Sequence, residues 1–177
     1  GAGDLRRALA LGVDGLWLAV PVGVVVTLLG VVLAGPLVSA FGADSTVNGH
    51  AETYLRIASL GITPLLLMLA STGVLRGLQD TRTPLVVAVG GFALNAVLNV
   101  VLVYPLGLGI AGSALGSVLA QTAMAVALVV AVVRGARRHG ASLAPDRSGI
   151  LAAARAGVPL VVRTLTLRAA LLVTTYA

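Results

Sequence analysis

The longest stretch of the chain without a charged side chain is TPLVVAVGGFALNAVLNVVLVYPLGLGIAGSALGSVLAQTAMAVALVVAVV, residues 83–133. A helix needs about 20 mostly apolar residues to cross a bilayer, so this stretch is too long for one span and suits two. The two spans would join at YPLGLG, residues 104–109. Main-chain amides in hydrocarbon must be hydrogen-bonded within their own segment, and no alternating pattern typical of a barrel is present. Both spans are therefore predicted to be α-helices.

The composition of the whole chain is that of a membrane protein. Of its 177 residues, 58% are hydrophobic and 10% are charged, and the mean hydropathy of +1.05 is outside the range of water-soluble domains. Three further apolar runs bring the expected number of spans to five, and the last run carries Arg163 and Arg168. We therefore expect an all-α fold, a polytopic bundle of membrane helices with spans at about 16–38, 57–75, 85–103, 110–133 and 158–177.

The placement of arginines predicts the orientation of these helices. The segment before the first span, the second connection and the fourth connection carry arginines, whereas the first connection is acidic and the third is uncharged. By the positive-inside rule the segments with arginine are cytoplasmic, and only Arg56 falls on the opposite side. This placement accounts for the net charge of +6, so nucleic acid is not an expected partner. The chain has no cysteine, which excludes disulfides and thiolate metal sites within it.

The polar stretch LRGLQDTRTPL, residues 75–85, is expected to be a cytoplasmic turn anchored by Arg76 and Arg82. Within it, Thr83 followed by Pro84 predicts the N-cap and the first residue of the third helix. Glycine and proline inside the other apolar runs are common in membrane helices, so the run at 57–75 is still expected to form one span.

Four polar side chains in the third and fourth spans are the candidate site residues: Asn95, Asn99, Ser117 and Gln121. Asn95 and Asn99 are one helical turn apart, as are Ser117 and Gln121, so each pair lies on one helix face. Because the two helices are antiparallel, Gln121 is expected at the depth of Asn95, and Ser117 at the depth of Asn99.

The spacing leaves two interpretations of these residues open. Polar groups are costly in a membrane and often mark a substrate or ion pathway, but amides and hydroxyls also join helices by hydrogen bonds. Gly112 and Gly116 are expected to form a packing face of small residues. His50 and His139 lie in predicted loops without a metal-binding partner, so no catalytic residue and no metal site is expected.

Two segments together resemble a known family. They are AETYLRIASLGITPLLLMLASTGVLRGLQDTRTPL, residues 51–85, and NAVLNVVLVYPLGLGIAGSALGSVLAQ, residues 95–121. Both are similar to the multidrug and toxic compound extrusion (MATE) family, specifically its DNA-damage-inducible branch. The resemblance implies a twelve-helix transporter of two six-helix lobes, of which this chain covers about helices three to seven. Residues 1–133 would belong to the N-terminal lobe, 134–157 to a cytoplasmic linker between lobes, and 158–177 to the incomplete first helix of the C-terminal lobe.

The resemblance also implies roles for individual residues. Asn95 matches an asparagine of the family's N-lobe cation site, and Asn99 stands where several members have aspartate. Ser117 is the nearest match to a hydroxyl of that site, and a sodium ion near Asn95 and Asn99 is one possibility. An amide cannot titrate, so a protonation role does not carry over to Asn99. The acidic residues of the chain are expected in connections or at helix ends, namely Asp4, Asp14, Asp44, Glu52, Asp80 and Asp146. A coupling carboxylate is therefore expected in a helix upstream of Gly1, consistent with a fragment of a longer protein.

The expected function is ion-coupled efflux of amphipathic or cationic small molecules by alternating access, driven by H+ or Na+ and needing no cofactor. The protein would be a multi-pass component of a bacterial inner membrane, surrounded by lipid and functional as a monomer. The alternative within the same superfamily is a flippase of lipid-linked oligosaccharides or peptidoglycan precursors. A membrane-embedded enzyme is the second alternative, and it would need clustered acids or histidines that the sequence does not show.

Overall fold

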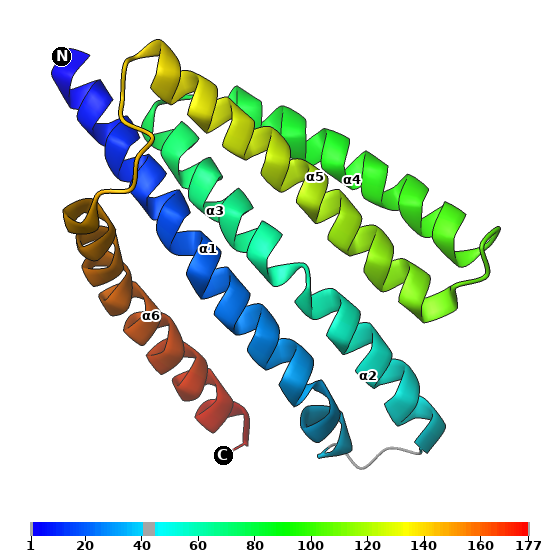
Figure 1. Ribbon diagram of the computed structural model, residues 1–177. Helices are drawn as coiled ribbons and strands as arrows, with labels where there is room; N and C mark the ends of the chain where they lie inside the picture. Colours follow the sequence, from blue (N-terminus) through cyan, green and yellow to red (C-terminus); the bar gives the residue numbers. More distant parts are fainter. Residues whose placement is uncertain (1, 41–44, 177) are drawn as a thin grey trace.

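The structure is a computed structural model that describes residues 2–40 and 45–176. Its regular elements are six helices (Figure 1), which confirms the all-α prediction for the described residues. Their bounds are α1 Ala2–Ser39, α2 Ser45–Ser59, α3 Ile62–Gly77, α4 Arg82–Val103, α5 Gly109–Arg138 and α6 Arg147–Tyr176.

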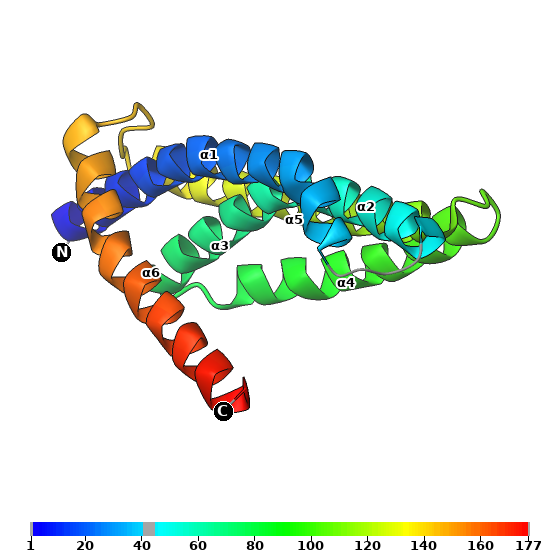
Figure 2. The same ribbon diagram turned by 90° about the horizontal axis from the view of Figure 1, so that it is seen from below.

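Helices α1, α4 and α5 and the end-to-end pair α2–α3 run lengthwise along one bundle (Figure 1), and α6 diverges from this bundle after its beginning (Figure 2). The beginning of α1, the turn between α3 and α4, and the connection between α5 and α6 gather at one end of the bundle. These are the segments that carry most of the arginines. The fold thus collects the basic segments at one end, and the assignment of that end to the cytoplasm remains a prediction.

Helix α1 is longer than the predicted span at residues 16–38. It has 38 residues and corresponds to about 57 Å, which exceeds the roughly 30 Å hydrocarbon core of a bilayer. The expectation that Asp14 lies in a connection or at a helix end is wrong, because residues 2–15 continue the helix. The apolar run predicted only the part of the helix that would lie in the membrane. Main-chain hydrogen bonds continue the helix from residue 16 back to Ala2.

The second predicted span is two helices rather than one. α2 and α3 are separated at Leu60 and Gly61 and bent by 40° from one another. Pro64 has no N–H, so the carbonyl of Leu60 lacks its helical donor at this point. The span also begins at Ser45 instead of residue 57, so Glu52 lies inside a helix, where its carboxylate pairs with Arg56 at 2.6 Å. This i, i+4 pair accounts for the arginine on the unexpected side.

The turn between α3 and α4 differs from the predicted cap. α4 begins at Arg82, and Asp80 rather than Thr83 supplies the capping oxygen, because its Oδ1 accepts the main-chain N–H of Thr83 at 3.0 Å. Hydrogen bonds from the Thr83 side chain and, second, from its main-chain N–H lower the pKa of the Asp80 carboxyl below its ordinary value. Pro84 is consequently the third residue of the helix.

The last two helices extend into the predicted linker. α5 includes residues 134–138, and α6 runs without a break through residues 147–157, so residues 139–146 connect the two helices. The side chain of Arg168 lies outside the described residues.

The core lies where α1, α3 and α5 meet. Its buried apolar side chains are Leu9, Val13, Leu16, Leu75, Leu128, Val132, Ala136 and Ala141. Helix α4 packs on α5 through small residues: a Cβ on Gly112 would come within 2.8 Å of the Leu102 carbonyl oxygen, and one on Gly116 within 3.3 Å of Asn99. The predicted packing role of Gly112 and Gly116 is therefore confirmed. Among the described residues, three helices are long and apolar enough to cross a membrane, or four if the bent α2–α3 pair counts as one span.

Candidate functional site

Three of the four predicted site residues form one hydrogen-bonded cluster between α4 and α5. Asn95 donates from Nδ2 to the Ser117 hydroxyl at 3.3 Å, and Asn99 donates from Nδ2 to Asn95 Oδ1 at 3.1 Å and to the Asn95 carbonyl at 3.0 Å. Ser117 in turn donates to the carbonyl of Ser113 at 3.1 Å. All three side chains are half-buried, so the cluster is neither sealed in the core nor fully open.

The cluster joins α4 to α5 and still has an oxygen available as a hydrogen-bond acceptor. Of its three side-chain oxygens, the Oδ1 of Asn99 accepts no hydrogen bond from the described residues. Amide and hydroxyl oxygens suit hard cations such as Na+ and hydrogen-bonding groups of a substrate. The geometry therefore combines both interpretations of the sequence: interhelical hydrogen bonds with an accessible polar face.

Gln121 lies on the same side of α5 but is not bonded into this cluster. Its Oε1 packs against Gly61, where a Cβ would collide with it, at the break between α2 and α3. Ser59 and Thr63 flank the same break, and Thr63 shares a hydrogen bond of 3.0 Å with Thr27 of α1. The sequence predicts Gln121 at the depth of Asn95, and in the structure its side chain packs against the break between α2 and α3.

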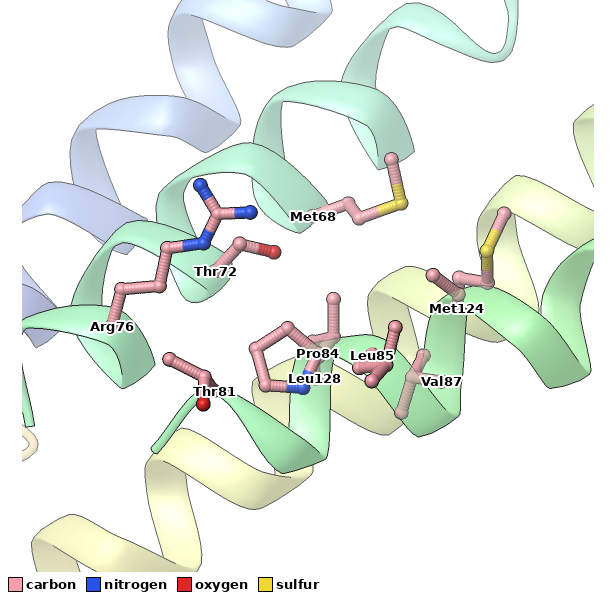
Figure 3. A pocket seen from close by; sticks show the side chains of 10 residues that line it. Met68, Thr72, Arg76, Thr81, Pro84, Leu85, Val87, Met124 and Leu128 are labelled. Atoms are coloured by element: carbon pink, nitrogen blue, oxygen red, sulfur yellow. The ribbon is translucent and has the colours of Figure 1, made fainter. Parts of the chain in front are cut away.

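A cavity of about 490 Å³ opens between α3 and α4, with α5 as its floor (Figure 3). Its lining is mostly apolar and includes Met68, Met124 and Leu128. Arg76 and Thr72 of α3 bring polar groups to it, and Figure 3 shows the Arg76 side chain beside Thr72. The cavity thus offers an amphipathic surface at the end of the bundle that carries the arginines.

The cavity and the polar cluster lie on the same faces of α4 and α5, and the residues of the cluster do not line the cavity itself. On α5, the floor residues Met124 and Leu128 continue the line of Ser117 and Gln121, because positions i, i+4, i+7 and i+11 share one helix face. On α4, Gly91 lies between the cavity-lining Ala88 and Asn95, which are two turns apart, and it packs directly against Met124. We define the amphipathic groove as this line of α5 with its walls from α3 and α4.

The polar cluster was predicted from the sequence, whereas the cavity beside Arg76 was not. Arg76 was assigned only to a turn, since a basic residue at a helix end is expected there on topology grounds alone. No periodic pattern distinguishes an anchoring arginine from one that lines a cavity. Among the described residues no group of three or more histidine, cysteine or acidic side chains is placed to hold a metal ion.

A comparison with protein-family models gives a match over more than half of the chain. The MatE family model matches residues 1–101. The chain belongs to the MatE family. MatE proteins are transporters rather than enzymes, and the chain is accordingly a multi-pass membrane protein.

Individual relatives resemble this MatE chain over about half its length. Protein DETOXIFICATION 44, chloroplastic, from Arabidopsis thaliana is 40% identical over 92 residues, which cover 52% of this chain and 18% of the relative. Probable multidrug resistance protein NorM from Oceanobacillus iheyensis is 27% identical over 91 residues, covering 51% of this chain and 20% of the relative. The aligned part therefore spans about a fifth of each of these curated relatives.

Two solved structures share the MatE fold. "Crystal structure of MATE in the bent conformation" superposes with a TM-score of 0.72 at 22% identity, over 88% of this chain and 40% of that one. "Inward-facing conformation of a multidrug resistance MATE family transporter of the MOP superfamily" gives a TM-score of 0.68 at 23% identity, over 89% and 42%. These similarities show that the helices of this chain are arranged as in MATE transporters.

Proposed function

We propose that the protein is an ion-coupled efflux transporter of amphipathic or cationic small molecules that works by alternating access. The observation that carries this proposal is that the Asn95–Asn99–Ser117 cluster lies on the same faces of α4 and α5 as a mostly apolar cavity. An apolar groove accepts the body of an amphipathic compound, and amide and hydroxyl groups orient its polar part.

The coupling ion is H+ or Na+, and the cluster is its proposed contact in this part of the chain. Cation binding by Asn95 and Asn99 would use amide oxygens, since neither side chain titrates. The described residues of the groove include no carboxylate. We therefore place the coupling acid in another segment of the protein, facing the cluster, where a buried carboxylate can change charge during the cycle.

The proposal extends to the rest of the molecule. The chain would form about helices three to seven of a transporter of the DNA-damage-inducible branch, with residues 1–133 in the N-terminal lobe. Residues 134–157 would link the lobes, and residues 158–177 would begin the C-terminal lobe. The full-length protein would act as a monomer in a bacterial inner membrane.

The test is transport by the full-length protein reconstituted in vesicles with an imposed H+ or Na+ gradient. Replacing Asn95 with Ala should reduce gradient-driven flux of an organic cation at least about tenfold, because the cluster loses the residue to which both partners are bonded. The melting temperature should fall only slightly, since interhelical hydrogen bonds in membranes contribute about 0.6 kcal/mol each. Asn99→Asp is the companion variant, and its new titratable group should change the pH dependence of flux.

A stability effect without a transport effect would contradict the proposal. If Asn95→Ala is strongly destabilised, yet the folded fraction transports normally, the cluster only joins α4 to α5. Turnover of a substrate by the purified protein without a gradient would instead favour an enzyme.

A flippase of lipid-linked precursors is the second candidate, and Arg76 favours it. A guanidinium at the mouth of a mostly apolar groove suits a phosphate-bearing head group better than a cationic drug. Arg76→Gln should then abolish movement of an anionic lipid-linked substrate, whereas it should leave efflux of organic cations unchanged or increased. The same pair of assays thus separates the two functions.

A further inference from the structure

The acidic residue Asp14 is buried at the junction between α1 and the segment that leads into α6. Its side chain is 4% exposed, although it lies near the basic end of the bundle. Its Oδ1 accepts the main-chain N–H of Asp146 at 2.9 Å. A buried carboxylate is costly unless hydrogen bonds or positive charge compensate it, so this contact demands a structural role.

A glycine of α6 faces the carboxylate of Asp14. Gly149, in the first turn of α6, packs directly on the carboxylate, and a Cβ at that position would collide with Oδ2. The helix N-terminus also carries a partial positive charge that favours an anion beside it. The first turn of α6 therefore complements Asp14 in two ways: Gly149 leaves room for the carboxylate, and the helix N-terminus favours its negative charge.

Trp17, one turn further along α1, holds the same connection at a second point. Its indole N–H donates to the carbonyl of Leu143 at 3.1 Å. Asp14 and Trp17 lie on one face of α1 and fasten the residues just before α6. A polar cavity of about 380 Å³ adjoins this contact and is lined by residues of both helices, including Leu11 and Ala152.

The orientation of α6 depends on this attachment. Among the described residues, α1 is the helix on which α6 chiefly packs. Figure 2 shows that α6 meets α1 near its own beginning and then diverges from the bundle. A small displacement at the first turn is therefore magnified along a helix of 30 residues, about 45 Å in length.

We propose that Asp14 is a positioning residue for transport: it fixes the start of α6 on α1 and so sets the angle between α6 and the bundle. The consequence for transport rests on the proposed function, in which α6 begins the second lobe. Alternating access requires the two lobes to rock against one another, so the anchor of α6 limits the rate of that motion. It does not touch the amphipathic groove.

The test is cross-linking of Leu11→Cys with Ala152→Cys by a short bifunctional thiol reagent, in the full-length protein with other cysteines removed. Asp14→Ala removes the acceptor of the Asp146 main-chain N–H and should slow cross-linking at least fivefold. Gly149→Ala should slow it similarly by forcing α6 away from the carboxylate. The double variant should cross-link faster than Gly149→Ala alone, because removal of the carboxylate makes room for the added methyl group.

Two variants control for general damage to the junction. Gly157→Ala adds the same methyl group to α6 at a position with nothing packed against it, and should cross-link within about twofold of the parent protein. Asp14→Asn keeps an acceptor oxygen and should restore most of the rate lost in Asp14→Ala. Normal cross-linking in Asp14→Ala, or equal losses in Gly149→Ala and Gly157→Ala, would overturn the proposal. If Asp14→Ala does not fold, Gly149→Ala against Gly157→Ala decides between the same outcomes.

Transport kinetics provide the functional measurement. Asp14→Ala should change the maximal rate of flux by at least about threefold while KM changes little, since the groove is intact. A change in KM alone would contradict a role in positioning α6. If the parent protein shows no gradient-driven flux, the proposed function fails, whereas the cross-linking result still tests the attachment of α6.

Discussion

At the scale of single residues, the contact between α4 and α5 depends on glycines with different tolerance for a side chain. A Cβ on Gly112 meets the main-chain oxygen of Leu102, which cannot move without shifting the whole helix. A Cβ on Gly91 meets the thioether of Met124, whose three rotatable bonds allow it to turn aside. The two glycines look alike in sequence, and their difference arises only from what the facing helix presents.

This difference predicts unequal effects of the same substitution. Gly112→Ala should lower the free energy of unfolding by about 1–3 kcal/mol, as expected for overpacking against a rigid neighbour. Gly91→Ala should cost less than about 1 kcal/mol, since the Met124 side chain can adopt another rotamer. Thermal unfolding of the full-length variants in detergent measures both. Equal losses, or a larger loss for Gly91→Ala, would show that Met124 is as rigid as the main chain.

At the scale of elements, apolar runs predicted the helices correctly but not where they begin, end or break. The run at 57–75 contains Gly61 and Pro64, which are tolerated in many membrane helices, so the break was not predictable from their presence alone. Helix ends are formed by local hydrogen bonds instead. Both α3 and α5 end with a residue in the left-handed region, Gln79 at φ 62° and Gly140 at φ 63°.

The same closing hydrogen bond is present at each of these two helix ends. Asp80 N–H donates to the Leu75 carbonyl, and Ala141 N–H to the Ala136 carbonyl, each at 2.9 Å. Only glycine adopts the left-handed conformation without steric cost.

Substitutions at the two left-handed positions should therefore act in opposite directions. Gly140→Ala should lower stability by about 1 kcal/mol, and Gln79→Gly should raise it by up to about 1 kcal/mol. Melting temperatures of the full-length variants provide the measurement. A lower melting temperature for Gln79→Gly would mean that its side chain contributes more than the strain costs.

At the scale of the whole molecule, the amphipathic groove is a product of tertiary structure. The equal depth of amides and hydroxyls on α4 and α5 follows from antiparallel helices and was predictable from the sequence. The wall from α3, the cavity beside Arg76 and the contact of Asp14 with the start of α6 were not, because they join residues far apart in the chain. The sequence shows which side chains each helix carries, whereas tertiary packing decides which helix faces contact one another.

The most direct test of the groove as a transport path is the reactivity of single cysteines in the full-length protein. Met124→Cys and Thr72→Cys line the cavity, whereas Val126→Cys lies at the depth of Met124 on another face of α5. A hydrophilic, membrane-impermeant thiol reagent applied from the cytoplasmic side should modify both groove positions and leave Val126→Cys unmodified. A transported organic cation should slow modification of the groove positions. Equal reactivity at all three positions, or no modification in the groove, would contradict the account.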